Sequence, residues 1–560
     1  MKHLSAFIIY TLLYVCSIQA QKPIPPMDIP MYMSGNFGEL RNNHFHSGID
    51  IKIQGKIGEP IKSIKEGYVS RINISPWGYG KALYVDHPDG TTSVYAHLDR
   101  LAKKIEQLAT DSQYVRQVFS INLYPDPGAL PVKQGEVIGF GGNSGSSGGP
   151  HLHFELRETI TEEPHDPLVL YKDRIRDTRK PEFKSFMIYP EAGEGVVNGR
   201  KEKQMLSFVT DKASKKTTLS PATIRVWGKL GFAVRAYDYM NNTHNTFGVK
   251  EVILKIDNQT VFHSDITHFS FSDTRYLNSF IDWEEWEYKK SFYMKSFIEP
   301  GNRLKIYRTT DSGIYDFNEE RKYSIAYTLR DLYGNTSTYT FTVEGKRQEI
   351  PAHIPQGEIL AHDREHLIER DGVSLTIPEG NLYRDTDFKF GIIKNFSPYS
   401  SYYQLGERMP LHSHCPLTIE ITNDVMNDKR KYGILSSNQK KITWVGGTYN
   451  EGVMTANVRE LGNYYVDVDT IPPKIVAQGQ ANWTKTKNIS FKVTDNLSGI
   501  NSWHATIGGQ FVLFEFDAKR NHLFCKYDPK RMKAGRNTLR LEVADAAGNT
   551  AVFESSVLLQ

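Results

Sequence analysis

The chain has 560 residues, of which 39% are hydrophobic and 24% charged, and this balance excludes a polytopic membrane protein and a disordered chain. Its 68 basic and 64 acidic residues give a net charge of only +4, so the composition shows no electrostatic footprint for nucleic acid. Aromatic residues make up 12% of the chain, which favours β-sheet. At about 150 residues per domain, the length predicts three to four domains.

Residues 1–20 are typical of a cleaved signal peptide. A Lys-His start precedes an apolar run from Leu4 to Val15, and the small residue Ala20 closes the stretch. The run is too short to span a bilayer comfortably, although an uncleaved anchor is the alternative. Bulky Tyr14 and Val15 precede Cys16, which argues against lipid modification there. We expect an exported protein of the periplasm or cell envelope, or one released outside the cell, with no transmembrane segment after signal removal.

We expect one domain at residues 21–175, in which a Gly-rich segment of short alternating strands runs from about Phe37 to Leu170 with one interruption. From Asp99 to Phe119 apolar residues recur at three- and four-residue spacing, which predicts one or two amphipathic helices. We therefore expect a helical insertion over about 99–130. It either packs against the domain or forms a wall of its groove, and packing is the favoured interpretation.

The rest of the chain shows strand-and-turn patterning without a chemical motif. Two linkers divide it: Gln348–Pro355 contains two prolines, and Asp469–Pro473 ends in a proline pair, which cannot join a central strand. We expect a β-sandwich-like module at 176–350, a β-rich module at 351–469 and an immunoglobulin-like sandwich at 470–560. The last unit resembles bacterial immunoglobulin-like domains whose final turn reads Asp-x-x-Gly-Asn, here Asp545–Asn549.

Four turns repeat one pattern in these modules, in which an apolar strand end is followed by Asp and then by a turn rich in Gly or Asn. They begin at Asp238, Asp331, Asp495 and Asp545. Asn and Gly supply the positive φ of such turns. One acidic residue per turn offers too few oxygens for calcium, so we expect structural turns.

Three His-x-His pairs occur, at 44–46, 151–153 and 412–414. With 18 His in the chain, about 0.6 such pairs are expected by chance, so the pair alone decides nothing. His151-Leu152-His153 has the most informative context, because it starts a strand and would point both imidazoles to one face. A Gly-rich loop, 141–150, precedes it and would let a partner's backbone approach closely.

Further upstream, His46 and Asp50 precede a strand, and His97 lies between the two regions. Two His and one Asp would give zinc three protein ligands and leave the fourth position for water, the arrangement of a catalytic site. A structural site would need a fourth Cys or His. Cys415 and Cys525 lie in distant segments, and we expect both to be buried free thiols.

His46-x-x-x-Asp50, Ala96-His97-Leu98 and Gly149-Pro150-His151-Leu152-His153-Phe154 together resemble the lysostaphin/LytM-type zinc metallopeptidases, over about residues 36–170. The resemblance implies a small twisted antiparallel β core, of the duplicated hybrid motif type, with zinc in a groove. It implies that His46, Asp50 and His153 bind zinc, while His97 and His151 activate the water and stabilise the oxyanion. The insertion is longer than the family core requires, which puts groove width and substrate choice in doubt.

The remaining histidines are weaker candidates. His44 could compete with His46 as a ligand but lies outside the matching motif. His412-Ser413-His414-Cys415 offers soft ligands, yet no second ligand cluster is evident in the sequence, and we expect a loop there.

The sequence therefore predicts a mainly β, exported zinc metalloendopeptidase that hydrolyses peptide cross-links of bacterial peptidoglycan, with zinc-activated water as the nucleophile. The β modules would engage cell-envelope protein partners. Two alternatives stay open: a zinc peptidase acting on proteins, and a non-catalytic scaffold that binds peptidoglycan or activates other hydrolases.

Overall fold

The computed structural model describes residues 22–210, 217–309, 312–438 and 441–560. The predicted signal peptide and Cys16 lie outside these residues. Within them, no helix combines the length and the apolar character needed to cross a bilayer. Below, the residues up to 175 are called the N-terminal domain, and 176–350, 351–469 and 470–560 the second, third and C-terminal modules.

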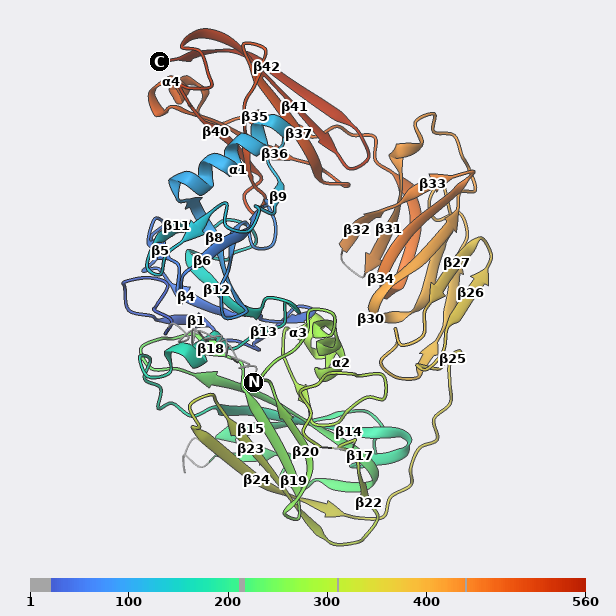
Figure 1. The fold of residues 1–560 in the computed structure, drawn as a ribbon. Helices are drawn as coiled ribbons and strands as arrows, with labels where there is room; N and C mark the ends of the chain where they lie inside the picture. The colour runs from blue at the N-terminus through green and yellow to red at the C-terminus, as the bar shows by residue number, and fades with distance from the viewer. Residues whose placement is uncertain (1–21, 211–216, 310–311, 439–440) are drawn as a thin grey trace, which may run out of the picture.

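The protein is strand-rich, as its composition predicts, and its four parts form a closed ring (Figure 1). The blue N-terminal domain lies between the green second module and the red C-terminal module, and the orange third module completes the circuit. Hydrogen bonds cross each of the four junctions: Asn36 to Gly248, Arg275 to the Leu411 carbonyl, Lys431 to the Ala547 carbonyl, and Lys519 to the Ser147 carbonyl.

The N-terminal domain is built on an antiparallel sheet with the strand order β1-β4-β12-β8-β7-β6-β10. Alternate side chains of these strands are fully buried, among them Ile49, Ile51, Leu152 and Phe154, and they form one hydrophobic core. The strands span Met33–Gly35 (β1), Ile49–Lys52 (β4), His151–Glu158 (β12), Thr91–Leu101 (β8), Lys81–Asp86 (β7), Gly67–Ile74 (β6) and Pro131–Val132 (β10).

The predicted insertion contains one helix, α1, at Lys103–Arg116. Residues 99–101 complete β8, and the helix ends where Gln117 adopts a left-handed conformation. After it, β9 (Ile121–Leu123) pairs with β6 and rejoins the sheet. Tyr114 on the outer side of α1 packs edge-on against Phe511 of the C-terminal module, so the insertion serves at least as a packing element.

The second module contains a sheet of order β16-β15-β14-β17-β24-β23-β19-β20. Phe37 and Phe45 of the N-terminal domain are buried in its core, so the two share apolar packing. The helices α2 (Leu277–Phe280) and α3 (Trp283–Lys289) lie in the chain between β20 and β23 of this sheet. The strands span Thr217–Ser220 (β16), Gln204–Thr210 (β15), Glu182–Val197 (β14), Arg225–Tyr239 (β17), Thr336–Gly345 (β24), Lys322–Arg330 (β23), Glu251–Ile256 (β19) and Gln259–Asp265 (β20).

The third module has its own core around the long strands β30 and β34. Its sheet runs β26-β27-β30-β34-β31-β32. The strands span His366–Arg370 (β26), Val373–Ile377 (β27), Tyr402–Glu420 (β30), Val453–Val468 (β34), Tyr432–Asn438 (β31) and Lys441–Gly446 (β32).

The loop prediction for His412-Ser413-His414-Cys415 is wrong, because these residues lie within β30. The register of β30 against β34 shifts between Pro410 and Cys415, and a bulge of this kind interrupts the regular alternation that would otherwise signal a strand. Cys415 and Cys525 are both free and buried, as predicted.

The C-terminal module consists of two four-stranded sheets, β35-β36-β40-β39 and β38-β37-β41-β42, around one core. The turn at Asp545–Asn549 joins β41 to β42, where the sequence places it. The strands span Lys474–Ala477 (β35), Asn488–Thr494 (β36), His522–Lys526 (β40), Glu515–Asp517 (β39), Gln510–Phe511 (β38), Ile500–Ile507 (β37), Gly535–Asp545 (β41) and Thr550–Leu559 (β42).

Candidate metal centre

Three neighbouring strands of the N-terminal domain place most of the candidate site. β12 lies between β4 and β8, so that His153 pairs with Asp50 on one side and with Ala96 on the other. His46 lies just before β4, and its backbone N–H donates to the Glu39 carbonyl at 2.9 Å. The register of the sheet therefore brings together residues that are far apart in the chain.

His97 reaches the site through a local distortion of β8. The pairing of β7 with β8 shifts between Lys81 and Leu83, and His97 has a φ of 60°, which is rare for a residue with a Cβ. Regular alternation after Ala96 would turn His97 to the opposite face, and a bulge re-aims such a side chain. The His97 ring lies 4.8 Å from that of His151, measured between centroids.

His46, Asp50 and His153 form a tight, buried triangle of donor atoms. His46 Nε2 lies 3.1 Å from Asp50 Oδ1 and 3.0 Å from His153 Nδ1, and His153 Nδ1 lies 3.0 Å from Asp50 Oδ1. Two nitrogens and one oxygen at such spacing are the donor set of a catalytic zinc site, in which ligands about 2 Å from the metal take tetrahedral positions. The residues present therefore fit zinc.

Outer contacts fix which imidazole nitrogen is free in each ligand. His46 Nδ1 lies 2.7 Å from the Asn36 carbonyl, and His153 Nε2 lies 2.7 Å from Glu155 Oε1. Since those nitrogens donate to an oxygen, the lone pairs remain on His46 Nε2 and His153 Nδ1, the two atoms that face Asp50. A metal-binding His is oriented in this way by its outer partner.

Glu155 is the centre of a buried network that sequence reasoning missed. It is 0% exposed, and it accepts hydrogen bonds from Arg157 Nε at 2.6 Å, from Ser47 Oγ at 2.6 Å and from the Tyr79 hydroxyl. A signal was present, because two charged residues at alternate positions of an apolar strand share the face of His153.

The electrostatics of the site favour a cation beside Asp50. Burial alone would raise the pKa of Asp50, but the imidazoles of His46, His151 and His153 outweigh burial and hold that pKa well below its usual range. Burial would likewise lower the pKa of His153, but the carboxylates of Asp50 and Glu155 outweigh it and raise that pKa to about 9. The two carboxylates thus favour a positive charge at this place, and a metal ion bound there would supply that charge in exchange for the proton on His153 Nδ1.

The two proposed catalytic histidines lie next to this triangle. His151 Nε2 is 3.3 Å from Asp50 Oδ1, while its Nδ1 is 2.8 Å from the Gly149 carbonyl. His97 Nδ1 is 2.9 Å from the Ser144 carbonyl. Burial, reinforced by the other imidazoles, lowers the pKa of His97 to about 3. His97 is therefore a neutral base whose Nε2 is free.

The C-terminal module contacts the Gly-rich loop beside His151. Lys519 Nζ donates to the Ser147 carbonyl at 3.0 Å and also to the Asn143 carbonyl. The ring of Trp77 meets that of Phe516 edge-on at 6.5 Å between centroids. The downstream part of the chain therefore borders the site.

The other sequence candidates lie elsewhere. His44 is exposed and is not among the residues that converge with Asp50. In the described part of the chain, two further clusters of acidic side chains could hold a metal ion, and both contain Asp residues of the repeated turns. Each turn contributes one acidic residue, as the sequence shows, but two turns and an Asp of the entry segment meet in each cluster.

Residues 44–120 match the model of peptidase family M23, and residues 357–469 match that of a Zu5-like domain. The DD-carboxypeptidase/endopeptidase Mpg of Neisseria meningitidis is 30% identical over 129 residues, which cover 23% of each chain. This chain thus spans about a quarter of the length of the curated relatives it matches.

Two solved structures show similarity to the N-terminal part. The catalytic domain of lysostaphin from Staphylococcus simulans is 23% identical, with 25% of this chain and 92% of that one covered and a TM-score of 0.19. The catalytic domain of the prophage-encoded M23 protein EnpA from Enterococcus faecalis is 26% identical, with 24% and 85% covered and a TM-score of 0.18.

The family match begins at His44 and so contains His46, Asp50 and His97, and the fold brings His151 and His153 of β12 against them. The N-terminal domain of this chain thus matches peptidase family M23 and carries the motifs that resemble its lysostaphin/LytM-type members.

Proposed function

We propose that the protein is an exported, zinc-dependent metalloendopeptidase that hydrolyses peptide cross-links of bacterial peptidoglycan. The observation that carries the proposal is the convergence of the free nitrogens of His46 and His153 on one oxygen of Asp50, with two further imidazoles beside them. The resemblance to lysostaphin/LytM-type enzymes and the relative named DD-carboxypeptidase/endopeptidase support a peptide bond of the cell wall as the substrate.

In this proposal His46, Asp50 and His153 hold the metal. When bound, zinc would supply Lewis-acid chemistry by polarising the scissile carbonyl and acidifying the attacking water. The Asn36 carbonyl and Glu155 keep both imidazoles in the binding tautomer and orientation. The buried partners of Glu155 hold it ionised, because Arg157 and His153 outweigh the effect of burial and keep its pKa far below the usual value.

His97 and His151 carry the proton chemistry. With Nδ1 of each ring held at a backbone carbonyl, the Nε2 lone pairs are available to take the proton of the attacking water. The ring that has taken this proton is an imidazolium, and its Nε2–H can donate to the developing oxyanion and then pass the proton to the leaving amine. The low pKa of His97 keeps that residue neutral before reaction. This role requires no change of tautomer at either ring.

Digestion of purified sacculi, followed by mass analysis of the released products, tests this function. Casein serves as the parallel substrate, and a chelator arm tests metal dependence. Release of muropeptides by the zinc-loaded protein, suppressed by chelator, is the expected result. Cleavage of casein alone would instead indicate a peptidase of proteins, and binding to sacculi without any product would indicate a scaffold.

His97→Ala and His151→Ala are the matched variants for the proton roles. Each should keep stoichiometric zinc while turnover falls about 10²- to 10⁴-fold, the usual contribution of a general acid or base. Zinc content by atomic absorption separates this effect from loss of the metal. Full turnover by His151→Ala would show that the assigned role is wrong.

A further inference from the structure

Three carboxylates meet where the N-terminal domain joins the second module. Asp177 lies on the segment that enters this module, Asp238 near the end of β17, and Asp331 directly after β23. One oxygen from each lies within 4.8 Å of the others. Their exposed fractions are only 7%, 4% and 4%, so three acidic groups share one buried place.

The hydrogen bonds of this cluster are incomplete. Asp331 accepts from the backbone N–H and the side-chain amide of Asn335 at 2.8 and 2.7 Å, and Asp177 Oδ1 accepts from the Arg179 N–H at 3.0 Å. Asp177 Oδ2 and Asp238 Oδ1 are buried without a partner. A buried polar atom without a partner is costly, and these two belong to side chains more than nine-tenths buried.

No basic side chain of the described residues forms an ion pair with any of the three carboxylates. The nearby cations are held by other groups: the Arg179 guanidinium lies over the Tyr239 ring at 4.6 Å, and Lys172 Nζ donates to the Leu332 carbonyl at 2.8 Å. Burial, reinforced by Asp331, raises the pKa of Asp238 to about 8. The cluster therefore needs either a bound proton or a bound cation.

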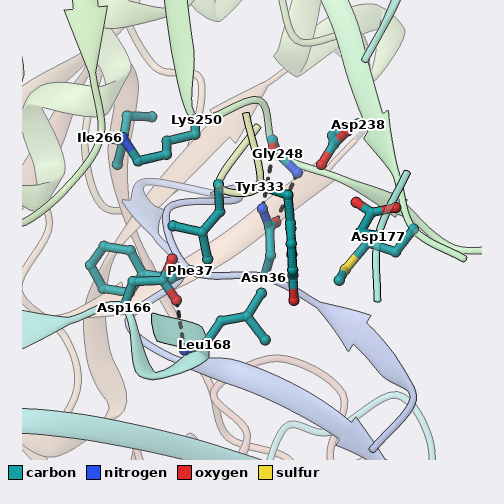
Figure 2. A pocket seen from close by; sticks show the side chains of 12 residues that line it. Asn36, Phe37, Asp166, Leu168, Asp177, Asp238, Gly248, Lys250, Ile266 and Tyr333 are labelled. Atoms are coloured by element: carbon teal, nitrogen blue, oxygen red, sulfur yellow. Dashed lines mark hydrogen bonds between the residues drawn. The ribbon is translucent and has the colours of Figure 1, made fainter. Parts of the chain in front are cut away.

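A small cavity adjoins two of the three carboxylate residues. Asp177 and Asp238 line it together with Tyr333 and Asn36, and its volume is about 20 Å³. Figure 2 shows the two carboxylates next to one another beside the Tyr333 ring, and the Tyr333 hydroxyl is also buried without a partner. Such a volume holds one small ion or one water.

A second cluster of three carboxylates, in the C-terminal module, has the same arrangement of segments. It differs from the first cluster in its backbone hydrogen-bond donors. Both have an Asp-Thr-x-x-Pro entry segment, a strand-end Asp and an Asp-x-x-Gly-Asn turn, which gives Asp469, Asp495 and Asp545 in the second copy. There, Asp469 Oδ2 accepts from the Ser498 N–H at 3.0 Å. Asp495 Oδ2 accepts from the Leu497 and Gly499 N–H groups. Backbone donors thus reach Asp469 Oδ2 and Asp495 Oδ2, and within this second cluster Asp495 Oδ1 is the one described carboxylate oxygen that is buried without a partner, against two in the first.

We propose that Asp177, Asp238 and Asp331 bind one hard divalent cation, with Ca²⁺ as the best fit. An all-oxygen, strongly anionic donor set is what Ca²⁺ prefers, and three carboxylates can supply most of its six to eight oxygen ligands. The ion would tie the entry segment to two strand ends and so fix the second module against the catalytic domain, next to the reciprocal hydrogen bonds of Asn36 with Gly248.

Calorimetric titration of the full-length, zinc-loaded protein with CaCl2 tests this site, with MgCl2 as the comparison cation. Asp238→Asn keeps the shape of the side chain and removes one charge, and Asp495→Asn is the matched control in the second cluster. Ca²⁺ should bind the wild type more tightly than Mg²⁺, and Asp238→Asn should weaken that binding by about tenfold or more. The control should retain it.

Thermal unfolding gives a second readout that does not depend on activity. Added Ca²⁺ should raise the Tm of the wild type and of Asp495→Asn but not that of Asp238→Asn, because only a ligand that binds the folded state stabilises it. If Asp238→Asn fails to fold, Asp331→Asn replaces it. Absence of Ca²⁺ binding to the wild type at about millimolar concentration, or binding that Asp495→Asn alone removes, would overturn the proposal.

Discussion

Two His-x-His pairs of this protein lie within β-strands, His151–His153 on β12 and His412–His414 on β30. Of these two, only the pair on β12 belongs to the candidate active site. His151 and His153 follow the regular alternation of β12, between β4 and β8, so Asp50 and His97 face them. His412 and His414 lie on β30 where its register against β34 shifts. His412 stacks on Tyr276 at 3.8 Å between centroids.

The difference between the pairs lies in their neighbours. Next to His153, β4 contributes the carboxylate of Asp50 and β8 contributes the imidazole of His97. Glu155 accepts a hydrogen bond from the other nitrogen of the His153 ring. Burial lowers the pKa of His412 to about 4, reinforced by the guanidinium groups of Arg275, Arg459 and Arg303 and opposed by Asp273. The surroundings of His153 therefore favour a bound cation, whereas those of His412, at a junction between modules, disfavour a positive charge.

The largest expected difference between the two His-x-His pairs is the effect of replacing one His of each with Ala, beginning with His153→Ala. The variant removes one of three metal donors and leaves the buried Glu155 without its imidazole partner. Zinc should be lost and sacculus hydrolysis should fall by about three orders of magnitude or more, because several kcal/mol of charge stabilisation disappear. His412→Ala is the control, and it should retain zinc and turnover. Zinc content and product release measure the two effects.

An intermediate effect is expected when only the outer partner is changed. Glu155→Gln removes the carboxylate that orients His153, so zinc affinity should fall about 10- to 100-fold. Glu158→Gln, at an exposed position of the same strand, is the matched control and should not change it. Competition with a chelator of known affinity measures the change, and equal affinities in the two variants would show that Glu155 has no positioning role.

The smallest effect concerns the pH dependence of His412. Its folded-state pKa of about 4 lies below the ordinary value of 6.5, so the unfolded chain binds more protons between these values. Stability from this residue is therefore complete above pH 6.5 and is lost as the pH falls toward 4. His412→Phe keeps an aromatic ring on Tyr276 but cannot titrate.

Across that window, the Tm of the wild type should fall by roughly 1–3 °C more than the Tm of His412→Phe, after allowance for solvent screening. His414→Gln, at an exposed position of the same strand, is the control. Burial and nearby arginines lower the pKa of His414 as well, but its exposure screens the effect, so this variant should stay closer to the wild type than His412→Phe does. Parallel pH profiles of the wild type and His412→Phe would contradict the assignment. Differential scanning calorimetry measures the three profiles.

Much of the candidate site could be predicted from the sequence because its motifs are local. The spacing in His46-x-x-x-Asp50 and in His151-x-His153 is short, and β12 keeps the regular alternation from which a common face was inferred. The helical insertion was recognisable for the same reason, although its helix is shorter than the periodicity suggested. The role of Glu155 was not predicted, because an acidic residue on a strand indicates a role at the site only once its contact with His153 is known.

Other features depended on distant contacts. The bulge that turns His97 into the site has no sequence pattern of its own, and the strand at His412 was mistaken for a loop because a register shift disturbs its pattern. Each repeated Asp turn contains one acidic residue, yet the two turns of each cluster meet with an Asp of the entry segment. The number of acidic residues in a single turn does not indicate that carboxylates from separate turns lie together.

The sequence by itself determined the β-rich character, the order of the chemical motifs and the residue types available at each. The tertiary structure alone decided which of them meet: the Asp50–His153 pairing, the left-handed His97 and the carboxylate cluster at the second module. The reason is physical. Alternation and turn chemistry arise from neighbouring residues, whereas a binding site requires donors from several strands, whose register is set by the packing of the whole sheet.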